Sequence, residues 1–187
     1  MSKSLARSSA GWCFAYAAAI NLYWCIDQIL YIDCVAGLAL LILGMYFNYG
    51  MFAAGGAGLN ALFMVYVTGR DLMQAGQSGT VAYMVFILIP DLIQLVAYIL
   101  LAVASLKRTA ALTLGSVAGC LMIIECALYI AAYFMGMSEF GSLSLVCLCL
   151  LLTAGGSVLM GKGFARRKKT KARSETEAPE TSEPEEP

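Results

Sequence analysis

Residues 80–105 read TVAYMVFILIPDLIQLVAYILLAVAS and contain a single charged side chain, Asp91. A helix needs about 20 predominantly apolar residues to cross the hydrocarbon core of a bilayer. This stretch exceeds that length, and a water-soluble fold would have to cover it with polar segments that the flanking sequence does not provide. We therefore expect residues 80–105 to form a membrane-spanning helix.

The same pattern extends along most of the chain. Residues 11–68 contain only Asp27 and Asp33 as charged side chains, and residues 109–137 contain only Glu125. Overall, 60% of the residues are hydrophobic, 13% are charged, and the mean hydropathy is +0.77. Soluble domains have about 25% charged residues. The composition predicts an all-α integral membrane protein whose environment is the lipid bilayer.

Six spans fit the transmembrane domain, residues 10–161, best. They are expected at about residues 10–32, 34–49, 51–68, 80–105, 109–135 and 142–161, with a polar loop over residues 69–79. The division of residues 10–68 into three spans depends on Asp33 and on the Asn48-Tyr49-Gly50 group. Two spans in that region would give a five-helix bundle, which is the alternative.

The placement of basic residues favours six spans. Six spans put Lys3 and Arg7 of the N-terminal segment 1–9, Lys107, Arg108 and the basic C-terminal region on one side. Cytoplasmic loops contain an excess of Lys and Arg. We therefore expect both termini in the cytoplasm and the protein in the cell membrane. The opposite side would hold Asp33, Glu139 and the oppositely charged neighbours Arg70 and Asp71.

The C-terminal region separates the two signs of charge. Residues 162–173 hold seven of the twelve basic residues, and residues 174–187 hold six of the twelve acidic ones. The acidic stretch contains no residue able to anchor a core, so we expect it to be disordered. The basic segment is expected to fix topology, with binding of anionic lipid as a second role and nucleic acid excluded as a partner. Its residues are Arg166, Arg167, Lys168, Lys169, Lys171 and Arg173.

Polar residues near the middle of the predicted spans form a candidate site for a proton or a cation. Pro90 should kink its helix, because proline lacks a backbone N–H and clashes with the preceding turn. Asp91 and Gln94 follow on one helical face. Glu125 and Asn60 are expected at a similar depth in neighbouring spans, where an acid normally faces the bundle interior.

No Lys or Arg is expected well inside any span to pair with these acids. Asp91 and Glu125 should therefore be protonated, or be stabilised by water or a bound cation. The alternative is that both are neutral structural groups that hydrogen-bond to neighbouring helices. Asp27 and Gln28 are expected at the membrane interface, beside aromatic residues.

Small residues predict close helix contacts. Gly115 and Gly119 form a G-x-x-x-G pattern, and Ala54 and Gly58 form a looser version of it. Such spacing lets two helices approach closely. We expect the contact to lie within one protomer rather than in a dimer, and association with a second copy or another membrane protein stays open.

The sequence provides no sign of an enzyme, a metal site or a cofactor site. The chain contains no histidine, which excludes H-E-x-x-H zinc sites and Ser-His pairs. The seven cysteines all lie in apolar segments without a C-x-x-C pair, and we expect them to be packing residues.

Two functional hypotheses remain. The first is a small transporter or channel-like protein that binds a proton or cation at the mid-membrane acids. The second is a membrane scaffold or assembly partner without transport activity, which the short chain and minimal loops would suit.

Overall fold

The structure, a computed structural model, describes residues 1–25, 32–78, 81, 84–136 and 140–165. Its elements are α1 (Lys3–Trp24), α2 (Ile32–Phe47), α3 (Gly50–Ser78), η2 (Met84–Leu88), α5 (Ile89–Leu106), α6 (Ala111–Phe134) and α7 (Phe140–Phe164). η2 is a π-helical turn, and the described residues include no strand. Asp27, Gln28, Glu139 and the basic residues from Arg166 onward lie outside the described residues.

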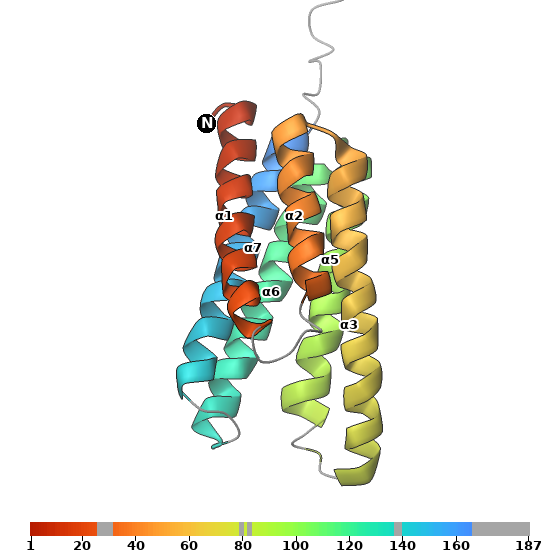
Figure 1. The fold of residues 1–187 in the computed structure, drawn as a ribbon, viewed down its shortest axis with the longest axis vertical. Coiled ribbons are helices and arrows are strands. Elements are labelled where there is room, and N and C mark those ends of the chain that lie inside the picture. The colour runs from red at the N-terminus through yellow and green to blue at the C-terminus, as the bar shows by residue number, and fades with distance from the viewer. Residues whose placement is uncertain (26–31, 79–80, 82–83, 137–139, 166–187) are drawn as a thin grey trace, which may run out of the picture.

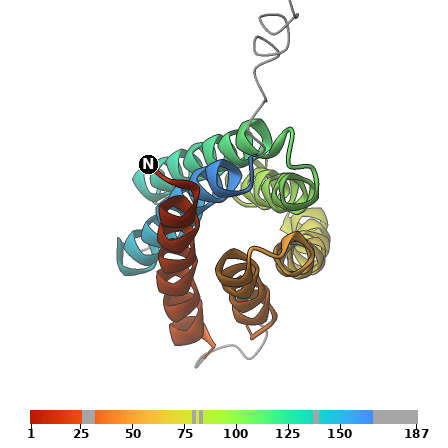
Figure 2. The same cartoon turned by 90° about the horizontal axis from the view of Figure 1, so that it is seen from above.

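The six long helices form a closed ring. Each packs against the next one along the chain, and α7 returns to pack against α1 (Figures 1 and 2). The described residues thus contain six long helices, as predicted, with three rather than two before residue 79. Four of them are long and apolar enough to cross a membrane, within Gly50–Gln74, Val85–Leu106, Ala111–Phe134 and Leu143–Phe164, and Ile32–Phe47 is a shorter apolar helix.

Large apolar side chains cover the outside of the ring. Every long helix exposes some of them, including Trp12, Leu43, Leu62, Ile99, Ile124 and Leu151. A soluble monomer rarely exposes continuous apolar surface of this extent. The exterior therefore fits a lipid environment, and the fold is an all-helical membrane bundle.

The turn between α2 and α3 explains how two helices fit into so short a stretch. Asn48 adopts a left-handed backbone conformation with φ of 54°, which asparagine tolerates better than most residues. Gly50 then starts α3 in contact with the carbonyl oxygen of Ser105 at the end of α5. A side chain at Gly50 would clash there, so the predicted punctuation residues form the turn itself.

Two helix boundaries differ from the expected ones. α1 begins at Lys3, because the Ser2 hydroxyl accepts a hydrogen bond from the Leu5 amide at 3.2 Å and caps the helix. α3 continues to Ser78, so residues 69–78 are helical and the expected polar loop is not present there. This stretch contains no proline and several good helix formers, and polarity alone does not end a helix.

Both ends of the described chain lie at the same end of the ring (Figure 1). The Lys3 ammonium donates a hydrogen bond to the carbonyl oxygen of Ala165, and the Arg7 guanidinium donates one to the Asn48 side chain at 2.8 Å. We call this end the terminal end. It also contains the α5–α6 connection with Lys107 and Arg108.

Glycine contacts hold neighbouring helices close together. Gly115 and Gly119 lie against α7, where an added Cβ would meet the carbonyl oxygens of Ser157 at 2.6 Å and Ala154 at 2.9 Å. The G-x-x-x-G pattern is thus used inside the protomer.

The small residues that pack in α3 are not the predicted ones. Gly58 meets no described atom within 4 Å beyond its own helix, whereas Gly56 contacts the backbone of α2. Ala53 and Ala57 are fully buried, and Ala54 is only partly buried. The packed face of α3 therefore contains Ala53, Gly56 and Ala57 rather than Ala54 and Gly58. The prediction assumed a different rotation of this helix about its own axis.

These contacts predict opposite effects for two glycine substitutions. Gly44→Ala would place a Cβ 2.5 Å from the Ala53 nitrogen, so we expect it to reduce the free energy of unfolding by about 1–3 kcal/mol. Gly58→Ala, in open space, should be neutral or stabilising by up to about 1 kcal/mol. Thermal unfolding of the two variants in the same detergent measures the difference, and equal melting temperatures would contradict the α2–α3 packing.

Candidate functional site

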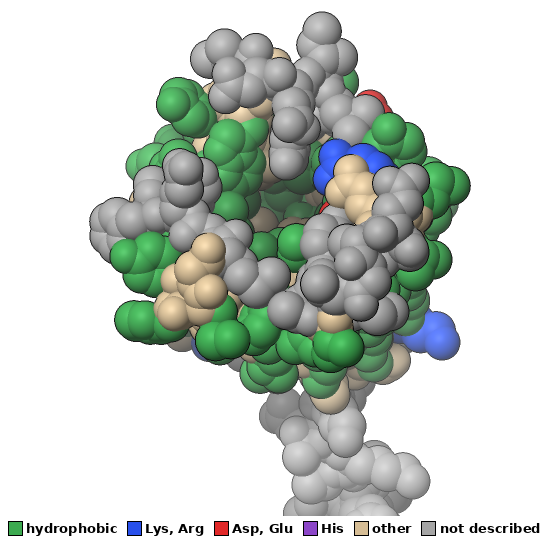
Figure 3. Space-filling model, turned by 90° about the horizontal axis from the view of Figure 1, so that it is seen from below, with side chains coloured by type: hydrophobic (Ala, Val, Ile, Leu, Met, Phe, Trp, Pro, Cys, Tyr) green, Lys and Arg blue, Asp and Glu red, His purple; other side chains and the backbone are tan. Residues whose placement is uncertain are grey.

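The interior of the ring divides into two parts. Toward the terminal end it is filled by fully buried Met45, Leu101 and Met160, which lie within two turns of their helix ends there, and further in by buried Phe14, Leu38, Leu41 and Met122. Toward the opposite end it contains a cavity of about 390 Å³. Figure 3 looks onto that end and shows a hollow in the middle of the ring, with a basic side chain at its edge. We call it the central cavity.

All six long helices contribute to the lining of the central cavity. Its polar lining residues are Asn21, Cys34, Arg70, Asp71, Asp91, Gln94, Glu125 and Cys149, and its aromatic ones are Trp24, Phe63, Tyr98 and Tyr129. Apolar side chains of α3, η2 and α7 complete the wall. A concave site with a few converging polar groups is the usual form of a small-molecule site.

Asp91 and Glu125, the two acids predicted for a site, both line the central cavity. Only 5% of Asp91 and 1% of Glu125 is exposed. Oδ2 of Asp91 and Oε2 of Glu125 are buried and have no hydrogen-bond partner among the described residues. An unpaired buried polar atom costs about 1–3 kcal/mol, and more when the group is charged. Within the described residues, no hydrogen bond offsets this cost at either oxygen.

The start of α5 positions Asp91. Pro90 lies in the first turn of α5, where a helix needs no N–H from it, and the residues before it widen into the π-helical turn η2. The expected disturbance at Pro90 thus takes the form of a π turn rather than a simple kink. Such turns are frequent at functional sites. Here the turn sets Asp91 on the inner face of the ring.

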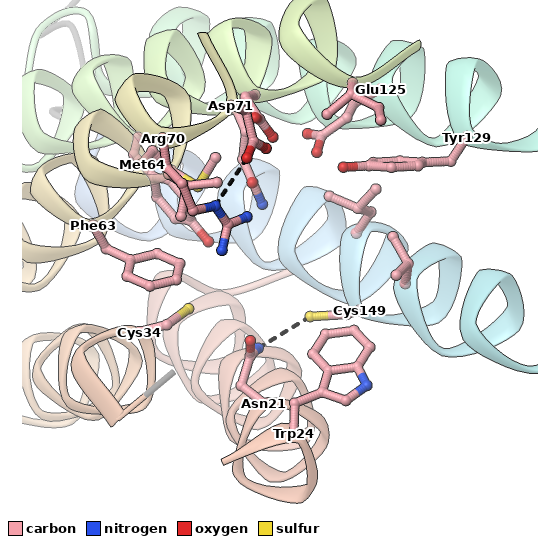
Figure 4. Close-up of a pocket in the computed structure, with 17 residues that line it drawn as sticks. Asn21, Trp24, Cys34, Phe63, Met64, Arg70, Asp71, Glu125, Tyr129 and Cys149 are labelled. Carbon is pink, nitrogen blue, oxygen red and sulfur yellow. Dashed lines mark hydrogen bonds and ion pairs between the residues drawn. The ribbon is translucent and has the colours of Figure 1, made fainter. Parts of the chain in front are cut away.

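Arg70 and Asp71 belong to the same cavity, which the sequence did not predict. They were expected in a loop, but α3 continues through them and directs both inward (Figure 4). Arg70 Nε lies 2.9 Å from Asp71 Oδ1, so the two charges pair as expected. Arg70 thus lines the same cavity as Asp91 and Glu125, but its ion pair is with Asp71.

This arrangement makes the cavity acidic. Its lining residues include three acids, Asp71, Asp91 and Glu125, and one base, Arg70. Arg70 pairs with Asp71. Asp91 and Glu125 each keep one oxygen that is not hydrogen-bonded within the described residues.

The other two predicted site residues, Gln94 and Asn60, lie in different places. Gln94 lines the central cavity, whereas Asn60 does not. Asn60 is fully buried between α3 and α2, where its Oδ1 would lie 2.6 Å from a Cβ at Gly37. Neither polar atom of its amide has a hydrogen-bond partner in the part of the chain that the structure describes. Asn60 is thus outside the acid cluster.

The aromatic and thiol residues of the wall were not singled out from the sequence. Tyr129 lies beside Glu125, one turn further along α6 (Figure 4). Asn21 donates from Nδ2 to the Cys149 sulfur at 3.3 Å and to the Ala17 carbonyl oxygen at 2.9 Å. Cys149 was expected to be a packing residue, but it also faces the cavity. These residues become neighbours through the order of the helices around the ring, which the sequence alone does not show.

The geometry defines a class of protein: a ring of six helices around a polar cavity near one end, with four of the helices long and apolar enough to cross a membrane. Comparisons of the chain with models of protein families, with curated proteins and with solved structures gave no match. The function is therefore inferred from the cavity itself.

The position of the central cavity predicts a pattern of thiol reactivity. We compare two single-cysteine variants that keep either Cys149, on the cavity wall, or Cys120, on the exposed apolar face of α6. A charged, membrane-impermeant thiol reagent should modify Cys149, and faster from the side opposite the termini, because only water-filled space admits it. Cys120 should stay unmodified in lipid. Equal labelling of both would contradict a hydrated cavity.

Proposed function

We propose that this protein is a small transporter or channel-like membrane protein whose central cavity binds a proton or a cation. The main supporting observation is the pair of buried carboxyl oxygens, on the cavity-lining residues Asp91 and Glu125, that have no hydrogen-bond partner among the described residues. Arg70, the basic residue of the lining, pairs with Asp71. A proton or a cation would satisfy both oxygens.

The cost of burying such groups supports a functional role. An acid at the bilayer centre costs about 2.5–3.5 kcal/mol on insertion scales, and such residues commonly mark ion or proton pathways. A purely structural acid would be expected to use both oxygens in hydrogen bonds between helices. Asp91 and Glu125 each keep one oxygen out of such bonds within the described chain.

The shape of the interior suits a pathway that is open on one side. The cavity occupies the end of the ring opposite the termini, and packed side chains fill the other half. With the basic residues of the terminal end in the cytoplasm, the opening would face outward. The π turn η2 beside Asp91 is the element of the wall best suited to rearrange.

Flux measurements in proteoliposomes test the proposal. We expect proton or cation flux from the wild type, and a fall of at least about tenfold in Asp91→Asn and Glu125→Gln, since each variant removes a charge-assisted contact. Asp33→Asn is the matched control, because Asp33 is an exposed carboxylate outside the cavity. Folding of each variant is checked by its elution as a single species and by its melting temperature.

A scaffold gives a different result. The wild type would then show no flux above empty liposomes, and the Asp91 and Glu125 variants would change only the melting temperature or the binding of a partner. That outcome would overturn the transport proposal.

A further inference from the structure

The charge of the central cavity calls for a cationic ligand. Its lining contains three acids, Asp71, Asp91 and Glu125, and one base, Arg70, which pairs with Asp71. An anion would face Asp91 and Glu125 without compensation in a low-dielectric site.

The lining favours an organic cation over an inorganic one. A dehydrated metal ion needs a close shell of oxygen ligands to replace its water. Within the described residues, no group of three or more His, Cys, Asp or Glu side chains is arranged to hold a metal ion. The acids are spread over α3, α5 and α6, and the rest of the wall is largely aromatic and apolar.

Four aromatic side chains stand on the cavity wall: Trp24, Phe63, Tyr98 and Tyr129. The face of an aromatic ring attracts a cation, and tryptophan does so most strongly. Tyr129 lies next to the Glu125 carboxylate (Figure 4), so one ammonium group could contact both. Aromatic rings together with a carboxylate are the usual elements of a site for alkylated ammonium ions.

The size of the cavity agrees with such a ligand. Small-molecule sites have volumes of about 300–1,000 Å³, and the central cavity measures about 390 Å³. A bare alkali ion would fill only a small part of it. A compact amine with an apolar body would fill more of it and cover the walls formed by Met64, Val67 and Leu150.

We propose that the ligand of the central cavity is an organic ammonium ion with a compact apolar body, whose charged group binds at Glu125 beside Tyr129. This inference rests on the proposed function, since it names the class of cation for the same site. Binding and flux are separate measurements, so the two proposals can fail independently.

Tryptophan fluorescence measures this binding. The chain has two tryptophans, Trp24 on the cavity wall and Trp12 on the exposed face of α1, so a Trp12→Phe variant reports from the cavity alone. The probes are cyclohexylmethylammonium, the uncharged cyclohexylmethanol of nearly the same shape, and sodium ions. None of them absorbs in the range of the tryptophan signal.

We expect a saturable change in Trp24 fluorescence with the ammonium probe, at an affinity at least about tenfold higher than with the alcohol or with sodium. Glu125→Gln should lower the affinity for the ammonium probe by about tenfold or more and leave the affinity for the alcohol unchanged. Asp33→Asn should change neither. If Glu125→Gln does not fold, the comparison of charged and uncharged probes on the Trp12→Phe protein still distinguishes a cation site from an apolar one.

Two results would overturn the inference. Sodium that saturates the signal as well as the ammonium probe would indicate an inorganic cation site, which leaves the proposed function intact. Equal binding of the alcohol and the ammonium probe would indicate an apolar site in which Glu125 has no role. Ammonium binding without any flux would uphold the ligand class and overturn transport.

Discussion

Two carboxyl groups in a chain this apolar impose the constraint on which the rest of the structure depends. Asp91 and Glu125 cannot face lipid, because exposing an acid to hydrocarbon costs more free energy than a single helix contact returns. They are placed on the inner face of a closed ring, with apolar side chains outward on every helix. The ring in turn depends on close backbone contacts at small residues, such as Gly44 against Ala53 and Gly115 against Ser157.

The same constraint explains why the interior is filled at one end only. Toward the terminal end, small residues of α3 and α6 let the helices approach, and leucine and methionine side chains fill the centre. At the other end, the acids, Arg70 and four aromatic residues surround a space that apolar side chains do not fill. The same polar side chains therefore surround the cavity and give it its charge.

Much of the fold could be predicted from the sequence, because the length of apolar runs and the placement of basic residues are direct physical signals. The six helices, the tight turn at Asn48 and the disturbance at Pro90 all follow from local chemistry. The site was predictable only in part. Asp91, Gln94 and Glu125 stand out as polar residues in apolar runs, but Arg70 and Asp71 resemble a loop until α3 is seen to continue through them. Asn60 and Gly58 were misplaced relative to the site and the packed face, since the rotational phase of a nearly uniformly apolar helix cannot be determined from its own residues.

We propose that Asp91 and Glu125 are accessible acids that exchange a proton or a cation through the cavity. Carbodiimide labelling of the protein in liposomes tests this, because the reagent modifies protonated carboxyl groups in apolar surroundings and needs no assumption about the ligand. We expect labelling of Asp91 or Glu125 that rises as the pH is lowered and falls when a binding cation is added, with modification sites located by mass spectrometry. Labelling that is absent, or that responds to neither pH nor cations, would show that the acids are sealed structural groups and would overturn the proposal.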